Sequence, residues 1–182
     1  MAHELIKKEL IYHGKVLDLS VTRFNSEASG EVDIEIVHHN GGAGAIPLFG
    51  DGTIGLVRQW RYPAGRYSVE ISAGRIEPGN TPEETAAREL EEEMGLRAAS
   101  LEKITDFLVA PGYSEERIHV YLATAISESQ QKLDDDEEIE VIRLKFADAI
   151  AMIHAGEIDD AKSIIALLLA GPLIKTHLEP RL

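Results

Sequence analysis

The sequence predicts an α+β fold in which a sheet lies between helices. Segments of alternating apolar and polar residues, which are typical of strands, recur from residue 16 to residue 146. One helix begins at Thr81, and a strongly apolar helix follows Asp159 or Asp160 near the end of the chain. This order, with most strands in the middle of the chain and the helices separate from them, is typical of an α+β domain.

The strands are predicted one by one from alternation and from the turns between them. Residues 16–24 place Leu17, Leu19 and Val21 on one side, which indicates a half-buried strand, and residues 32–38 alternate again after a turn. These two segments predict an N-terminal hairpin. The other predicted strands are 43–49, 53–62, 68–72, 101–109, 118–123 and 139–146.

A helix over residues 82–94 is predicted by its two ends and by its faces. Thr81 is a hydroxyl N-cap, Pro82 occupies the first helical position, Glu84 is placed to close a capping box, and Gly95 ends the helix. At about 100° per residue, an apolar arc lies beside an acidic arc. The apolar arc holds Ala86, Ala87, Leu90 and Met94, and the acidic arc holds Glu89, Glu92 and Glu93.

The acidic arc is chemically unusual because its members lie three and four residues apart. Like charges at this spacing repel by a few tenths of a kcal/mol per pair in an isolated helix. A plain solvated helix, the common reading of such a run, gains nothing from this arrangement, whereas a hard divalent cation would turn the repulsion into attraction. The pattern therefore favours a metal site on the helix.

Composition and charge narrow the class of protein. The 182 residues suit one domain with a small extension, and the absence of cysteine excludes disulfides and thiolate chemistry. A formal charge of −14 disfavours nucleic acid and anionic membranes as partners. The longest apolar run, residues 164–171, is too short to span a bilayer, and the first ten residues lack a signal-peptide core. We expect a cytoplasmic protein that binds no membrane.

The stretch from residue 74 to residue 96 resembles the Nudix box. In that pattern a glycine is followed after five residues by Glu, and after seven more by Arg-Glu-apolar-any-Glu-Glu-any-Gly-apolar. Asn80 stands where the family has its first glutamate. The eight matching positions are Gly74, Arg88, Glu89, Leu90, Glu92, Glu93, Gly95 and Leu96.

This resemblance implies a Nudix α/β/α sandwich with a mixed sheet in residues 41–182, preceded by a β-hairpin extension in residues 1–40. It also implies hydrolysis of a pyrophosphate bond, with Mg²⁺ or Mn²⁺ as the cofactor. The implied metal ligands are Glu89, Glu92, Glu93 and the carbonyl of Ala73, and Arg88 would orient the carboxylates. Asn80 is expected to alter the surroundings of the site without abolishing activity, because the helical ligands are present.

Further segments resemble the ADP-ribose pyrophosphatase branch of the family. Pro111 lies sixteen residues after Gly95, and residues 57–63, 70–74 and 156–163 are also similar to that branch. The branch implies ADP-ribose as substrate, cleaved to AMP and ribose 5-phosphate. It implies Glu137, with Glu138 as its rival, as the base that activates water. It also implies a homodimer in which the N-terminal strands are exchanged.

The remaining candidate residues are assigned to substrate binding. Arg61, at the end of a predicted strand, is a candidate phosphate clamp, although a surface salt bridge is the alternative. By resemblance, Glu35, Pro111, Gly112 and Tyr113 hold the base or the terminal sugar, and Glu35 acts on the site of the partner subunit.

Three alternatives compete with ADP-ribose hydrolysis. GDP-mannose or another nucleoside diphosphate sugar is the nearest one, since related Nudix enzymes share the architecture. A non-catalytic ADP-ribose sensor on the same fold is disfavoured by the intact box glutamates. A calcium-binding protein is disfavoured because the required spacing of oxygen ligands is lacking.

Overall fold

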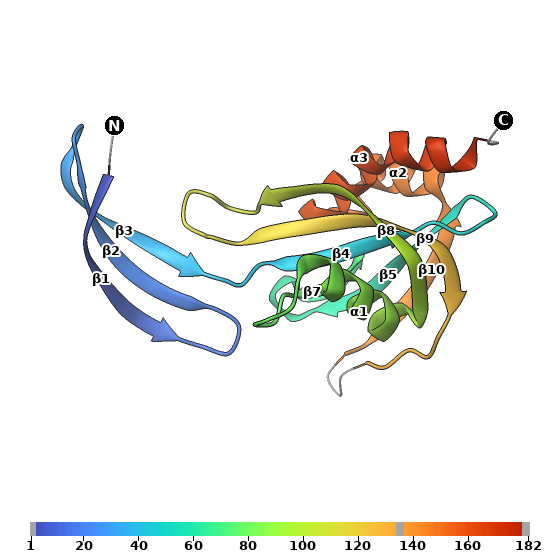
Figure 1. The fold of residues 1–182 in the computed structure, drawn as a ribbon, viewed down its shortest axis with the longest axis horizontal. Coiled ribbons are helices and arrows are strands. Elements are labelled where there is room, and N and C mark those ends of the chain that lie inside the picture. Colours follow the sequence, from blue (N-terminus) through green and yellow to red (C-terminus); the bar gives the residue numbers. More distant parts are fainter. Residues whose placement is uncertain (1–2, 134–136, 180–182) are drawn as a thin grey trace. The chain divides into compact units, whose positions relative to one another are not determined.

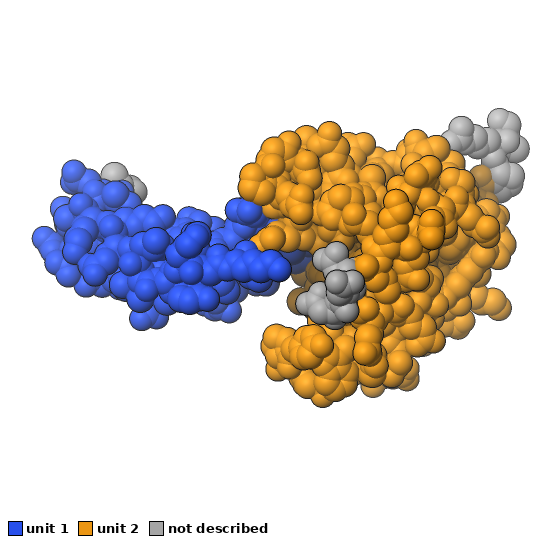
Figure 2. Space-filling view, turned by 90° about the horizontal axis from the view of Figure 1, so that it is seen from below, with its two compact units in different colours: residues 1–41, 107–118 blue, residues 42–106, 119–182 orange. Residues whose placement is uncertain are grey.

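The computed structural model describes residues 3–133 and 137–179, and the chain divides into two compact units. The first unit contains residues 1–41 and 107–118, and the second contains residues 42–106 and 119–182 (Figure 2). The first unit therefore includes a segment from the middle of the chain that the predicted extension, residues 1–40, leaves out.

A three-stranded antiparallel sheet forms most of the first unit, in the order β1 (His3–His13), β2 (Asp18–Ser26) and β3 (Gly30–His38). The predicted hairpin is confirmed as β2 and β3. β1 was not predicted, because its register shifts between Leu5 and Lys7 and between Leu10 and Tyr12. An extra residue at each shift breaks the period of two on which the prediction of strands depends.

Burial in β2 does not follow the apolar side that its alternation predicts, since Leu19 and Val21 are only partly buried. Ser20 and Thr22 are the buried side chains in the middle of β2, whereas Leu17 is exposed. Ser20 is satisfied by a hydrogen bond between its Oγ and Nε2 of His38, at 2.8 Å. The exposed large apolar side chains of β1 and the turn after it are Leu5, Ile6, Leu10, Ile11, Tyr12 and Val16.

Two sheets and three helices form the second unit (Figure 1). One sheet has the order β10-β5-β6 and the other has the order β7-β4-β9-β8. The strands are β4 (Gly42–Pro47), β5 (Thr53–Arg61), β6 (Arg66–Glu70), β7 (Ser72–Arg75), β8 (Leu96–Leu108), β9 (Arg117–Glu128) and β10 (Ile139–Lys145). A 3₁₀ turn, Tyr62–Ala64, joins β5 to β6.

The helices are α1 (Pro82–Met94), α2 (Phe146–Ala155) and α3 (Ala161–Leu178). α1 packs on β4 and β7, whereas α2 contacts β10 and α3, so helices flank the strands on two sides (Figure 1). The predicted α+β fold, with its sheet layer between helices, is confirmed. Asp160, not Asp159, caps α3, because its Oδ2 accepts a hydrogen bond from the Ser163 N–H at 2.9 Å.

Two predicted faces need correction. Ala87 is exposed, so the buried face of α1 is narrower than predicted. In α3 the predicted apolar side is only partly buried, since Leu167 is inside but Leu168 and Leu169 are about half exposed. α3 is long and apolar enough to cross a membrane, yet its small side chains Ala166 and Ala170 pack inside the unit as in a core helix.

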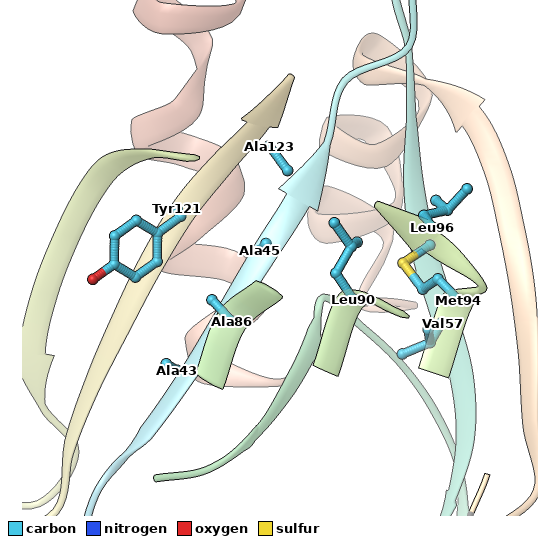
Figure 3. Close-up of a cluster of buried hydrophobic side chains, with 9 residues drawn as sticks. All are labelled: Ala43, Ala45, Val57, Ala86, Leu90, Met94, Leu96, Tyr121 and Ala123. Atoms are coloured by element: carbon cyan, nitrogen blue, oxygen red, sulfur yellow. The ribbon is translucent and has the colours of Figure 1, made fainter. Parts of the chain in front are cut away.

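The core beneath α1 fixes the position of the acidic arc. Leu90 and Met94 point from α1 into a cluster that also contains Ala45 and Val57 (Figure 3). Gly55 lies in the same layer. A Cβ at this position would lie only 2.6 Å from Cε of Met94, so the packing leaves no room for a larger residue. The other members of the cluster are Ala43, Ala86, Leu96, Tyr121 and Ala123.

Candidate active site

Both ends of α1 are built as predicted, and they fix the rotation of the helix. The N–H of Thr81 donates to Glu84 Oε2 at 2.8 Å, and the N–H of Glu84 donates to Thr81 Oγ1 at 3.2 Å. Gly95 adopts the left-handed conformation with φ of 64°, and its N–H bonds to the carbonyl of Glu91. Because Leu90 faces the core, the acidic arc of Glu89, Glu92 and Glu93 lies beside the buried face of α1.

Arg88 joins two of the three arc carboxylates. Its Nη2 lies 2.6 Å from Oε1 of Glu89, and its Nη1 donates to Oε2 of Glu92 at 2.5 Å. The guanidinium therefore orients this part of the cluster, the role that the family resemblance implies for it. The third carboxylate, that of Glu93, is almost completely buried, with 3% of the residue's surface exposed.

β7 brings backbone atoms to the acidic arc. The N–H of Ala73 donates to Glu93 Oε2 at 3.1 Å, so this predicted ligand residue adjoins the buried carboxylate. The next residue, Gly74, makes room for Glu89, because a Cβ at Gly74 would lie 1.9 Å from Glu89 Oε1. The glycine that opens the sequence pattern thus leaves the space that the Glu89 carboxylate occupies.

Burial makes two of the carboxyl groups poor anions in the absence of a cation. Burial, the largest cause, and the charges of Glu89 and Glu137 together raise the pKa of Glu93 to about 8, although an interaction with the Ser72 side chain opposes them. Burial likewise raises the pKa of Glu89 to about 7, although the charge of Arg88 opposes this. Carboxyl groups are not normally buried at such energetic cost unless a partner compensates them.

The donor set fits a hard divalent cation. Carboxylate and carbonyl oxygens are the ligands that Mg²⁺ and Mn²⁺ prefer, and a cation between Glu89 and Glu93 would lower both raised pKa values. Within residues 3–133 and 137–179, no three acidic or histidine side chains already converge around one point. Glu89 and Glu92 are instead both paired with the guanidinium of Arg88.

Glu137 and Glu138 face different neighbours. The hydroxyl of Tyr67 donates to Glu138 Oε2 at 2.9 Å. Burial is the largest cause of the raised pKa values of Glu89 and Glu93, but the charge of Glu137 contributes to both. Of the two rivals for the water-activating base, Glu137 is therefore the one electrostatically coupled to the acidic arc. Residues 134–136, the rest of the acidic run, lie outside the described residues.

Arg61 belongs to a buried ion network that the sequence did not predict. Its Nε and Nη2 bond to the two carboxylate oxygens of Glu70 at 2.8 and 2.6 Å, and Lys162 also pairs with Glu70. Hydrogen bonding to Glu70 is the largest cause of the raised pKa of Arg61, and the charge of Glu93 adds to it. Arg61 is thus coupled to the acidic arc, and its partner is a buried carboxylate.

Comparison with known proteins decides the family. A family profile described as "NUDIX domain" matches residues 38–167, which is more than half of the chain and includes the whole box. The chain belongs to the Nudix family. This confirms the resemblance on which the sequence-based predictions rested.

Individual relatives of this Nudix protein cover almost its whole length. "ADP-ribose pyrophosphatase" of Bacillus subtilis is 40% identical over 169 residues, which is 92% of this chain and 91% of the relative. "GDP-mannose pyrophosphatase" of Pectobacterium atrosepticum is 32% identical over 177 residues, covering 90% of this chain and 91% of the relative. The crystal structure titled "ADP compounds hydrolase" superposes with a TM-score of 0.87 at 20% identity, covering 97% of this chain and 96% of that one, which supports the same fold.

The Nudix box of this chain departs from the family pattern at one place. Asn80 is exposed in the turn before α1, where its N–H donates to the carbonyl of Glu77 at 3.1 Å. Its position in the turn leaves the contacts among Arg88, Glu89 and Glu92 in place. The effect of Asn80 on activity stays a prediction.

The predicted residues for the base and sugar all lie in the first unit. Glu35 is exposed on β3, and the exposed turn of Pro111, Gly112 and Tyr113 adjoins the end of the same strand, because the Val37 N–H donates to the carbonyl of Tyr113 at 2.8 Å. The structure thus brings the turn to β3. Assignment of these residues to substrate binding remains a prediction.

Proposed function

We propose that this Nudix protein hydrolyses the pyrophosphate bond of a nucleoside diphosphate sugar with Mg²⁺ as its metal ion. ADP-ribose, cleaved to AMP and ribose 5-phosphate, is the leading substrate. The observation that carries the proposal is the carboxylate cluster of α1, in which Glu93 is buried against the N–H of Ala73 and Glu89 occupies the space beside Gly74. The activity agrees with the printed names of the relatives.

The residues that would hold the metal are Glu89, Glu92, Glu93 and the carbonyl of Ala73. When bound, a divalent ion neutralises phosphate charge and polarises the phosphorus centre toward attack. Mn²⁺ could replace Mg²⁺, since both take oxygen ligands. Arg88 supports this set by holding Glu89 and Glu92 through its two Nη atoms.

The protein's own groups supply the proton transfer and the binding of charge. Glu137 accepts a proton from water as the water oxygen bonds to phosphorus, and the bridging P–O bond breaks to release two phosphomonoesters. Arg61, whose side chain remains 38% exposed while Glu70 anchors it, can also donate to a phosphate oxygen of the substrate. Electrostatic coupling of Glu137 and Arg61 to Glu93 supports both roles.

Predictions about oligomeric state, partners and location belong to the same proposal. A homodimer with exchanged N-terminal strands is supported by the many apolar side chains that β1 exposes, since large exposed apolar surfaces mark interaction sites. A nucleotide sugar is the partner of the active site, and no nucleic acid or membrane is expected, given the charge of −14. A cytoplasmic location stays a prediction.

A panel of substrates tests the proposal. ADP-ribose, GDP-mannose, other nucleoside diphosphate sugars and dinucleotides are incubated with the protein and Mg²⁺, and alkaline phosphatase then converts any phosphomonoester product to inorganic phosphate. Phosphate release from ADP-ribose above that from the other compounds is expected, and omission of Mg²⁺ from the first incubation, with Mg²⁺ restored after the protein is removed, should abolish it.

The panel also separates the alternatives. Faster phosphate release from GDP-mannose than from ADP-ribose would make GDP-mannose the preferred substrate. The bond that is hydrolysed would still be a pyrophosphate bond. If no compound is cleaved while ADP-ribose binds, the protein is a sensor and the hydrolase proposal is wrong.

A further inference from the structure

We infer that Tyr67 is a positioning residue for the water-activating step, because its hydroxyl holds Glu138 and thereby directs Glu137 toward the carboxylates of α1. This inference rests on the proposed function, in which Glu137 is the base. The two glutamates are adjacent in the sequence, so something must select which of them faces the acidic arc. The hydrogen bond of 2.9 Å from Tyr67 to Glu138 provides that selection.

The ring of Tyr67 is itself held in place from two sides. Cζ of Arg58 lies 4.0 Å from the ring centroid, a cation–π arrangement. The ring of Trp60 packs edge-on with a centroid distance of 5.2 Å and an interplanar angle of 76°. Trp60 is the strand partner of Tyr67 in the pairing of β5 with β6, so the backbone also fixes the ring. The hydroxyl is thus presented at a defined position.

The residues that follow Glu138 have contacts that alternate between two sides. Ile139 packs against the core cluster beneath α1, whereas Oε2 of Glu140 lies 3.4 Å from Nη1 of Arg58. Glu138 and Glu140 therefore share the side of Tyr67 and Arg58, and Ile139 points the other way. Glu137 precedes Glu138, so continued alternation places it on the side of Ile139.

Strand pairing sets this alternation only from Ile139 onward, where β10 begins opposite Gln59. Glu137 and Glu138 lie before that pairing. A slip of one residue in an extended segment exchanges the two sides, and here it would turn Glu138 toward α1 and Glu137 away from it. The hydrogen bond from Tyr67 holds Glu138, the residue directly before the paired strand, where such a slip would begin.

The chain on the other side of residues 134–136 is tied to the end of α1. The N–H of Lys132 donates to the carbonyl of Glu92 at 2.8 Å, and Nε2 of Gln131 donates to the carbonyl of Glu93 at 2.7 Å. The bond from Tyr67 to Glu138 is the matching attachment on the β10 side. The bonds of Gln131 and Lys132 place that flank next to Glu92 and Glu93, and the bond from Tyr67 holds the flank that leads into β10.

Tyr67→Phe tests the inference, since it removes only the hydroxyl and keeps the ring contacts with Arg58 and Trp60. We expect kcat for ADP-ribose to fall about tenfold, which is less than the loss expected when a general base is removed altogether. KM should change less than twofold. The matched control is Tyr62→Phe, the same change on the other tyrosine beside Trp60, which should leave kcat unchanged. A wild-type kcat for Tyr67→Phe would overturn the inference.

Substitutions at Glu138 separate positioning from direct catalysis. Glu138→Ala should lower kcat as Tyr67→Phe does, whereas Glu138→Gln keeps an oxygen acceptor and should lose less. The double variant of Tyr67→Phe with Glu138→Ala should be no slower than either single variant, because both remove one interaction. Equal losses for Glu138→Gln and Glu138→Ala would make Glu138 the base and would contradict the inference.

A Glu137→Ala background distinguishes failure of the inference from failure of the proposed function. Glu137→Ala alone should slow hydrolysis, and adding Tyr67→Phe should then have no further effect. If Glu137→Ala leaves kcat unchanged, the assignment of the base is wrong. If Glu137→Ala is slow but Tyr67→Phe slows it by another tenfold, the base assignment survives and Tyr67 acts by another route.

Discussion

At the scale of single residues, the site depends on how closely β7 approaches α1. Gly74 leaves the space that the Glu89 carboxylate fills, and the N–H of Ala73 reaches Glu93. The faces of α1 follow from sequence spacing, because positions on a capped helix are set by local rules, whereas the roles predicted for its box residues come from the family resemblance. Burial of Glu93 and the network around Glu70 could not be predicted, since they arise from contacts between residues distant in the sequence.

Gly74→Ala is predicted to disable the site while the helix persists. The added Cβ must displace the Glu89 carboxylate, and a misplacement of about 1 Å typically costs about 100-fold in rate. Steady-state kcat with ADP-ribose and Mg²⁺ measures this loss. Gly50→Ala is the control, because a Cβ there has open space, and it should behave as wild type. Equal activity of the two variants would show that close approach at Gly74 does not matter.

Metal binding is predicted to release protons in a window set by Glu89 and Glu93. Their metal-free pKa values of about 7 and about 8 leave them largely protonated at pH 6.5, and ligands must ionise to bind metal. Titration calorimetry in buffers of different ionisation enthalpy should show release on the order of one proton per Mg²⁺ bound at pH 6.5, and none at pH 9. Identical proton release at both pH values would count against these two groups as ligands.

At the scale of elements, local signals predicted the ends of α1 and most strands, and long-range contacts decided the rest. The hairpin and the capping box were predictable because alternation and cap residues act within a few positions. β1 was missed because its shifted register hides alternation, and the exposure of Leu168 on α3 depends on which neighbours cover that helix. The ion network of Arg61, Glu70 and Lys162 is also tertiary, since it joins β5, β6 and α3.

Glu70 is predicted to make this junction sensitive to acid. Burial alone would raise its pKa, but the hydrogen bonds and charges of Arg61 and Lys162 outweigh burial and lower it to about 2. Because the pKa is lower in the folded state than the ordinary 4.5, this stabilisation is present above pH 4.5 and is lost as the pH falls toward 2. Denaturant unfolding at a series of pH values measures the dependence.

Glu70→Gln removes the titrating group and should flatten the dependence in that window. At pH 7 it should lower the free energy of unfolding by about 3 kcal/mol, because Arg61 and Lys162 lose their buried partner. Glu83→Gln, an exposed position in the first turn of α1, is the control and should retain the wild-type dependence. An unchanged free energy of unfolding in Glu70→Gln would show that the network contributes nothing to stability.

At the scale of the whole molecule, the first unit exposes the apolar side chains of β1 and buries hydroxyl groups of β2. A soluble monomer rarely leaves so many large apolar groups in contact with water. A second copy of the chain would cover them, in agreement with the homodimer proposed above. Which residues of β1 are exposed could not be predicted, because the register shifts of this strand interrupt the alternation of its residues.

Leu10→Asp is predicted to convert a dimer to a monomer. Leu10 is 56% exposed in the single chain, and a charge there would be buried without a partner at an apolar interface. Light scattering after size exclusion measures the mass, and Leu10→Met, which keeps the apolar side chain, should remain dimeric. A wild-type protein that is monomeric at micromolar concentration would contradict the dimer.

The α1 carboxylates are central to the proposed hydrolysis, and Glu93→Gln tests their role most directly. The measurement is kcat for ADP-ribose at saturating Mg²⁺, with circular dichroism to confirm that the fold is retained. Loss of a buried ligand should lower kcat by about 1,000-fold, since metal stabilisation of the transition state amounts to several kcal/mol. Glu83→Gln on the same helix should keep wild-type turnover. Turnover of Glu93→Gln at the wild-type rate would remove α1 from the mechanism.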